Sequence, residues 1–247
     1  MDVMRDYETE LNNRIEFIRG IVKSAGARGI VFGNSGGKDC ALAGILCKLA
    51  CEDTVGIMMP CGSKQNYGSD KTDAVAFAEQ FGIETRMIDL TGVKEALVRE
   101  TGKVTEISDA ALANIAPRLR MTALYTVAAS EKRLVAGTGN RSEIYMGYFT
   151  KWGDGAYDFN PIGDLTVTEV YEFLHYLKAP VSILEKVPSA GLFEGQTDES
   201  EMGITYKSID EYLLTGAACE DDLTILNRYH STSEHKRKLP VIYNNAE

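Results

Sequence analysis

The feature that most restricts the fold is a glycine-rich turn between two apolar segments, within residues 28–50. The run from Ile30 to Phe32 is short and rich in β-branched and aromatic residues, whereas the segment from Cys40 to Ala50 is longer and rich in alanine and leucine. This contrast predicts a strand, a tight turn and a helix. The turn therefore lies at a helix N-terminus, where free N–H groups and the helix dipole favour an anion. A phosphate group is the predicted ligand.

The turn has the sequence Gly-Asn-Ser-Gly-Gly-Lys-Asp, which matches neither of the two best-known phosphate loops. A Walker A loop needs a glycine five residues before Gly37 and a hydroxyl residue after Lys38, but Phe32 and Asp39 stand there. In the remaining pattern, Ser-Gly-Gly-x-Asp, the serine and the glycine amides can hold a pyrophosphate, and Asp39 can bind the accompanying magnesium. The loop resembles the pyrophosphate loop of the N-type ATP pyrophosphatases, although an ordinary strand-to-helix turn also fits this segment alone.

Composition restricts the class of protein. A chain of 247 residues, 44% of them hydrophobic, can bury the core of a single globular domain. The N-terminal segment is acidic and therefore does not predict a signal peptide, and no apolar run is long enough to predict a membrane span. We therefore expect a cytoplasmic protein. Five cysteines without a C-x-x-C pair indicate reduced thiols rather than zinc or redox chemistry. The net charge of −10 argues against a nucleic-acid or anionic membrane partner.

The order of predicted elements indicates the fold class. Strands are predicted at residues 29–32, 54–59, 84–90 and 133–136, and helices at 6–25, 40–50, 69–81, 93–100, 109–115, 118–130 and 166–178. This βαβ alternation predicts a single α/β domain, residues 1–247, with a Rossmann-like, doubly wound and mostly parallel sheet and helices on both faces. Ligands bind beyond the carboxyl ends of such strands, which places Gly33 and Gly137 on one rim. Residues 148–163 lack periodicity and are predicted to form a functional loop.

Five segments of the chain resemble the ammonia-dependent NAD synthetases, and together they span nearly its whole length. They are "SGGKD", "ANIAPRLRM", "GTGNRSEIYMGYFTKWGDGAYDFNPIGDL", "KVPSAGLFEGQTDESEMGITYKSIDEYL" and "EHKRKLP". The resemblance implies amidation of nicotinic acid adenine dinucleotide (deamido-NAD) to NAD through an adenylated carboxylate, with release of AMP and pyrophosphate. It also implies Mg²⁺ bound with ATP, a homodimer, and a mobile loop near 148–163 with a C-terminal tail near 230–247. Glutamine-dependent relatives carry a large extra amidase domain, so we expect ammonia as the nitrogen source.

The same resemblance implies roles for individual residues. The residues expected to contact ATP are Gly33, Ser35, Gly36, Gly37, Lys38, Asp39, Cys40, Thr138 and Ser189. Those expected to bind deamido-NAD are Asn114, Arg118, Lys151, Asp158, His235 and Lys236. Asp39 and Glu143 are the expected magnesium ligands, and Asp154 and Lys151 are the expected catalytic residues. We hypothesise that Asp154 removes a proton from ammonium, because only neutral ammonia is a nucleophile.

The chain departs from the family pattern at three positions, two that change where a lysine stands and one where a cysteine replaces a serine. Val167 stands where the family commonly has a lysine that contacts ATP, and Lys38 stands where a neutral residue is usual. We interpret the pair as compensating changes; the alternative is that Lys38 points into solvent. Cys40 replaces the usual serine and weakens a possible hydroxyl contact to phosphate.

Two other functions remain open from the sequence. One is another N-type ATP pyrophosphatase of the tRNA-thiolating or GMP-forming type, and the other is a non-catalytic nucleotide-binding module. The acidity of the chain and its cysteine spacing count against the first, and the presence of Glu143, Asp154 and Asp158 counts against the second.

Overall fold

Four parallel strands lie at the centre of the structure, a computed structural model that describes residues 5–62, 69–186 and 197–243. They are β1 (Gly29–Gly33), β2 (Thr54–Met58), β3 (Glu84–Met87) and β4 (Arg133–Ala136). Their spatial order is β3-β2-β1-β4, so β1 is central and the chain crosses over the sheet between strands. In register, Val31 of β1 lies opposite Val55 and Val135. The predicted parallel sheet is confirmed.

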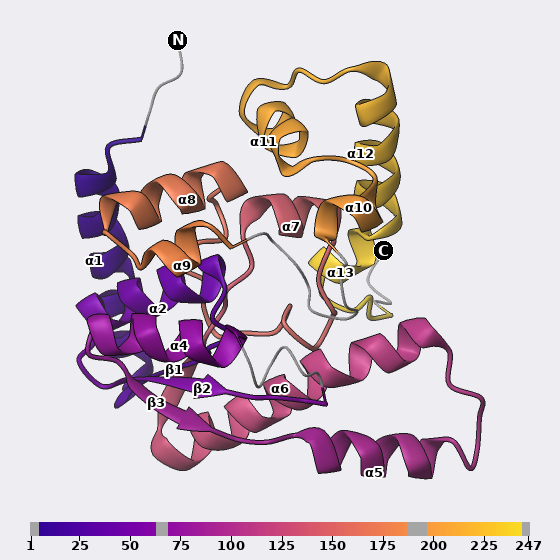
Figure 1. Cartoon of the computed structure of the whole chain (residues 1–247), viewed down its shortest axis with the longest axis horizontal. Helices are drawn as coiled ribbons and strands as arrows, with labels where there is room; N and C mark the ends of the chain where they lie inside the picture. Colours follow the sequence, from indigo (N-terminus) through magenta and orange to yellow (C-terminus); the bar gives the residue numbers. More distant parts are fainter. Residues whose placement is uncertain (1–4, 63–68, 187–196, 244–247) are drawn as a thin grey trace.

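Helices cover both faces of the sheet (Figure 1). One face carries α1 (Tyr7–Ala25), α2 (Lys38–Ala50), α4 (Ser69–Gln80), α8 (Val167–Tyr176) and α9 (Val181–Leu184). The other face is covered by α6 (Asp109–Glu131), with α5 (Thr91–Thr101) packed beside it. The remaining helices are α7 (Arg141–Met146), α10 (Asp198–Met202), α11 (Tyr206–Thr215), α12 (Glu220–Thr232) and α13 (Glu234–Arg237).

The alternation of side chains along β1 explains the two layers. Ile30 and Phe32 point into the core beneath α1, α2 and α8, while Val31 points into the core beneath α6. Such continuous apolar strands are typical of parallel sheets that are buried on both faces. Gly44 of α2 lets the helix approach the strand, because a Cβ there would lie 2.5 Å from the Phe32 ring.

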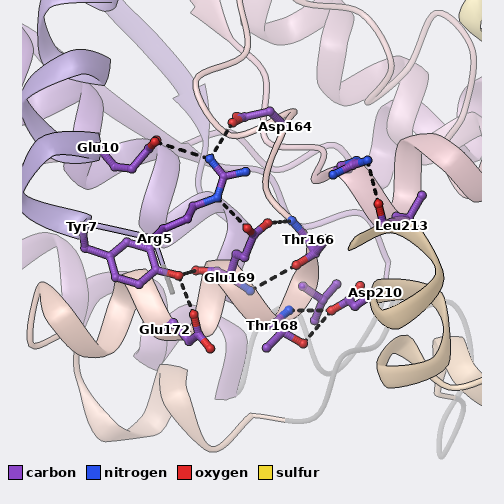
Figure 2. Close-up of polar contacts among 12 residues, drawn as sticks. Arg5, Tyr7, Glu10, Asp164, Thr166, Thr168, Glu169, Glu172, Asp210 and Leu213 are labelled. Carbon is purple, nitrogen blue, oxygen red and sulfur yellow. Dashed lines mark hydrogen bonds and ion pairs between the residues drawn. The ribbon is translucent and has the colours of Figure 1, made fainter. Parts of the chain in front are cut away.

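A third cluster of apolar side chains joins α7 and α8 to the C-terminal helices, and polar contacts fix the arrangement. The carboxylate of Asp210 on α11 accepts hydrogen bonds from Ser142 Oγ at 2.5 Å and from Thr168 Oγ1 at 2.7 Å. Figure 2 shows this contact to Thr168, and beside it the ion pair of Arg5 with Glu169 at 2.5 Å. These contacts hold the N-terminus of α8 in place. Thr166 and Glu169 form a capping box at this N-terminus.

Two predicted element boundaries are wrong. Residues 109–115 and 118–130, predicted as separate helices, form the single helix α6 with Pro117 inside it. A proline there removes one backbone hydrogen bond, but the helix continues because α6 packs along β1 and β4. The strand predicted to end at residue 90 ends at Met87, where the chain is exposed. Polar Asp89 bonds the backbone N–H of Thr91 and begins the turn into α5.

The cysteines are all free thiols, as predicted from their spacing. Cys40, Cys47 and Cys61 are buried, Cys51 is half-buried and Cys219 is exposed. Among the described helices, none has the length and apolar character needed to cross a membrane.

Candidate active site

The glycine-rich turn forms a backbone loop between β1 and the first turn of α2. Gly36 has a φ of +70°, and a Cβ on it would lie 2.3 Å from the carbonyl oxygen of Asp70, so only glycine fits against α4 here. Asn34 links the loop to α4, because its Nδ2 donates to the carbonyl of Ala74 at 3.1 Å and its Oδ1 accepts from Gly36 N at 3.2 Å. The N-terminus of α2, with Gly37 as its cap, thus faces the carboxyl edge of the sheet.

Asp39 and Glu143, the two expected magnesium ligands, are brought together by Asn140. Asn140 Nδ2 donates to Asp39 Oδ1 at 3.0 Å, while its own Oδ1 accepts from the backbone N–H of Glu143 at 3.0 Å. The backbone N–H of Asn140 in turn donates to Glu143 Oε2 at 3.3 Å, which completes a capping box at the start of α7. The two carboxylates therefore come from different helices but share one residue, Asn140, which contacts Asp39 through its side chain and the Glu143 carboxylate through its backbone N–H.

Lys38 points into this acidic cluster and not into solvent, which overturns the alternative left open by the sequence. Its Nζ lies 2.7 Å from Asp39 Oδ2, and the residue is only 6% exposed. The ammonium also lies 5.7 Å from the ring centre of Tyr206 and 6.0 Å from that of Tyr171. Burial opposes the charge of Lys38, but Asp39 and Glu143 raise its pKa. The side chain is thus a fixed cation inside the site.

The charges of the cluster suit a divalent cation. Burial, and then the neighbouring Asp39, raise the pKa of Glu143 to about 8, while Lys38 and the N–H of Asn140 act in the opposite direction. One lysine thus leaves part of the repulsion between the carboxylates uncompensated. Within residues 5–62, 69–186 and 197–243, no three metal-binding side chains converge. Mg²⁺ is often held by one or two carboxylates and completed by phosphate oxygens, so Asp39 and Glu143 fit that role.

A cavity of about 740 Å³ opens over the loop at the carboxyl edge of the sheet. Residues 137–139 after β4 line it together with the loop, so Gly33 and Gly137 lie on one rim as predicted, with Thr138 next to them. Cys40 also lines it, but its thiol bonds the carbonyl of Gly37 at 3.1 Å and accepts from Ser35 Oγ at 3.3 Å. Ser189, the other residue expected to contact ATP, lies outside the described residues.

The predicted loop at residues 148–163 carries Asp154 to the wall of the cavity. The Asp154 carboxylate accepts from the N–H of Thr150 at 3.0 Å, and Thr150 Oγ1 donates to Asn114 Oδ1 at 2.6 Å. Desolvation in the cavity raises the pKa of Asp154, against the opposing effects of the Thr150 N–H, Lys236 and Arg120. A carboxylate with a raised pKa is a stronger base than an ordinary one.

The remaining residues expected to bind deamido-NAD lie at the edge of the site. Lys151 Nζ donates to the carbonyls of His235 and Lys238, and Arg118 Nε donates to the Lys151 carbonyl at 3.4 Å. The side chains of Arg118 and His235 are exposed. The structure therefore brings Arg118, Lys151 and His235 together, and none of the three lines the cavity.

Lys236 and Asp158 each bond backbone groups, and Asp158 also bonds a tyrosine hydroxyl. Lys236 lines the cavity, and its Nζ donates to the carbonyls of Gly147 at 2.8 Å and Phe149 at 2.9 Å. Asp158 accepts from the N–H of Val135 at 2.7 Å and from Tyr125 Oη at 3.2 Å. These contacts hold the loop in place: Lys236 bonds its first residues, and Asp158 bonds β4.

Sequence reasoning missed two cavity residues, Arg120 and Lys186, and the buried Asn140 that bonds Asp39. Lys186 Nζ bonds Asp70 at 2.8 Å, Asp73 at 2.9 Å and the carbonyl of Gly36 at 3.2 Å, so it ties α4 to the phosphate loop. Arg120 Nε donates to the Met59 carbonyl at 3.0 Å. The Asn-x-x-Glu capping box was a local signal for Asn140. Nothing local distinguishes Lys186 from a surface lysine.

Three kinds of comparison with known proteins, by family model, by curated relatives and by solved structures, agree on the family. The family model described as NAD synthase matches residues 10–240. A curated relative, the NH(3)-dependent NAD(+) synthetase of Carboxydothermus hydrogenoformans, is 45% identical over 240 residues, covering 96% of this chain and 98% of the relative. The solved NMN synthetase of Francisella tularensis is 37% identical with a TM-score of 0.92, covering 97% of this chain and 99% of that one. The NH3-dependent NAD synthetase of Campylobacter jejuni is 30% identical with a TM-score of 0.79, covering 97% and 100%.

Proposed function

The chain belongs to the NAD synthase family, and on this premise we propose that it catalyses the ATP-dependent amidation of deamido-NAD to NAD with ammonia. The observation that carries the proposal is one cavity lined by a phosphate loop, by the carboxylate pair Asp39 and Glu143, which suits magnesium, and by Asp154. The same membership supports a homodimer that acts in the cytoplasm.

The reaction needs these groups because it has two steps, activation of the carboxylate and attack by ammonia. A carboxylate does not react with ammonia, because oxide is a poor leaving group. In the first step a carboxylate oxygen attacks the α-phosphorus of ATP, and the bond from that phosphorus to pyrophosphate breaks. In the second, the nitrogen of ammonia attacks the carbonyl carbon, the bond to AMP breaks, and one proton is lost as the amide forms. Held by Asp39 and Glu143, Mg²⁺ would supply positive charge to the departing pyrophosphate.

The proposed roles follow the geometry. The loop amides with Ser35, Lys38 and Thr138 bind the ATP phosphates, since all of them line the same rim of the cavity. Asp154 accepts a proton from ammonium. Arg118, Lys151 and His235 bind the part of the dinucleotide that extends beyond the cavity, and Lys236, which lines the cavity, binds the adjoining part. Asn114 and Asp158 hold the loop beside them.

A second candidate substrate comes from the backbone comparison. The chain superimposes on the Francisella NMN synthetase with a TM-score of 0.92, against 0.79 for the Campylobacter NAD synthetase. The corresponding reaction amidates the deamido form of the mononucleotide NMN. It needs the same phosphate loop, carboxylate pair and proton acceptor, because the reacting carboxylate is the same.

One assay tests both substrates. We expect the purified protein with ATP, Mg²⁺, ammonium and deamido-NAD to form AMP and NAD in equal amounts, with a higher kcat/KM than for the deamido mononucleotide. Glutamine in place of ammonium is expected to give no product in ammonia-free buffer. A higher kcat/KM for the mononucleotide would favour the second candidate. AMP without any amide product would contradict both.

Lys38 gives a quantitative prediction for ATP use. We expect Lys38→Gln to weaken ATP use by roughly ten-fold or more, because a charge-assisted contact to phosphate contributes about 1.5–3 kcal/mol. Val167 packs in the cluster that contains Tyr206 and Tyr171, the two rings next to the Lys38 ammonium. A lysine at position 167 can therefore reach the same region, and Val167→Lys is expected to restore much of the loss.

The measurement is steady-state kinetics in ATP for the single variants and the double variant, with a thermal melt of each to exclude unfolding. Lys38→Arg serves as the control that keeps a buried cation. An unchanged KM for ATP and an unchanged turnover in Lys38→Gln would mean that the site functions without this charge.

A further inference from the structure

Asn140 occupies a position that helix capping alone does not explain. It is 0% exposed and begins α7, where its Oδ1 accepts from the N–H of Glu143 at 3.0 Å. Serine and aspartate cap helices as well as asparagine does, because each offers an oxygen acceptor. Neither supplies the second feature seen here, an amide N–H₂ that donates to Asp39 Oδ1 at 3.0 Å.

The orientation of the Asn140 amide is fixed by its partners. Turning the amide over would place its oxygen against the Asp39 carboxylate and its N–H₂ against the N–H of Glu143. Both contacts would then be repulsive, so the network determines which end is oxygen. One buried side chain thus links the start of α7 to a carboxylate on α2 that is 101 residues away in the chain.

Both carboxylates are held by named partners as a result. Asp39 receives Asn140 on Oδ1 and Lys38 on Oδ2 at 2.7 Å, so the plane of the carboxylate is defined. Glu143 receives the backbone N–H of Asn140 on Oε2 at 3.3 Å. The spacing between the carboxylates therefore depends on a single residue that contacts both.

We propose that Asn140 is a positioning residue that sets the distance and orientation of Asp39 and Glu143 for binding of magnesium with ATP. The inference rests on the proposed function, because it takes these carboxylates as the magnesium ligands. Groups that orient metal ligands commonly change metal affinity by about 10- to 100-fold when they are replaced. The amide is needed here because its acceptor end serves the helix and its donor end serves Asp39.

The test separates capping from positioning by comparing three variants. Asn140→Ser keeps the cap, but its hydroxyl is one bond shorter and does not replace the amide donor to Asp39. Asn140→Ala loses both functions. Thr166→Ala is the matched control, since it removes the cap of another capping box, at α8, that does not contact either carboxylate.

The readout is binding of ATP by calorimetry at a series of magnesium concentrations, without any deamido substrate, together with a thermal melt. In Asn140→Ser we expect the magnesium concentration for half-maximal ATP binding to rise by about 10- to 100-fold, with a melting temperature near that of the wild type. Asn140→Ala should show the same rise and a lower melting temperature. Thr166→Ala should show only the lower melting temperature.

Two results would overturn the inference. One is an unchanged magnesium dependence in Asn140→Ser. The other is a rise in Thr166→Ala as large as that in Asn140→Ser, which would make the effect a general consequence of lost stability. If Asn140→Ser does not fold, Asn140→Thr, which caps and fills more volume, decides by the same titration. A wild-type protein that binds ATP without any response to magnesium would instead contradict the proposed function.

Discussion

Asp39→Asn and Glu143→Gln are each expected to lower kcat by roughly 10²- to 10³-fold, the loss that follows removal of one group stabilising transition-state charge. Both changes keep the size of the side chain and remove one negative charge from the pair that we assign to magnesium. The measurement is steady-state turnover at saturating ATP over a range of magnesium concentrations. Glu172→Gln, which makes the same change at a carboxylate that is bonded to Tyr7 at 2.6 Å and does not line the cavity, is the control. Activity near the wild-type value in either variant would remove that carboxylate from the metal site.

The two variants should differ in stability, and the sign follows from the pKa of Glu143. Its pKa of about 8 in the folded protein lies above the ordinary value of 4.5. The folded state therefore binds a proton more tightly than the unfolded chain, so the free energy of unfolding falls as pH rises from about 4.5 to about 8. Without magnesium, Glu143→Gln should remove this dependence and melt at a higher temperature near pH 8. Asp39→Asn should melt lower, because it takes the ion-pair partner from buried Lys38.

Asp154→Asn is expected to lower kcat/KM for ammonium by about 10²- to 10⁴-fold near neutral pH, the usual range for a lost proton acceptor. Asparagine keeps the hydrogen bond from the Thr150 N–H, so the loop should stay in place. Formation of the adenylated intermediate should change much less, because that step does not involve ammonia. Pre-steady-state release of pyrophosphate measures the first step, and NAD formation measures the second.

The pH profile distinguishes proton removal from simple positioning. The pKa of Asp154 is raised, so the wild-type activity with total ammonium should increase with pH until the carboxylate is ionised and then level off. In Asp154→Asn the activity should instead follow the fraction of free ammonia and increase by about ten-fold per pH unit without levelling below the pKa of ammonium. Parallel profiles for the two proteins would show that Asp154 does not take the proton.

Local patterns in the sequence determined the elements and their chemistry. The apolar run at residues 30–32 and the glycines after it are sufficient for a strand, a turn and an anion-binding helix N-terminus, because these depend on neighbouring residues alone. The same holds for the capping box at Thr166 and for the alternation that predicted a parallel sheet. A parallel sheet brings the ends of its strands to one edge, so the meeting of Gly33 and Gly137 at one cavity was also predictable.

Only the tertiary structure decided which faces and partners these elements have. Arg118 and Arg120 belong to the same helix, but Arg118 is exposed and Arg120 lines the cavity, since residues two apart in a helix point in different directions. Lys38 is buried against Asp39 because Tyr171 of α8 and Tyr206 of α11 lie next to its ammonium, an arrangement that a local pattern does not contain. Asn140 reaches Asp39 across 101 residues. A contact at that separation depends on how the helices pack on the sheet, and packing is a property of the whole chain.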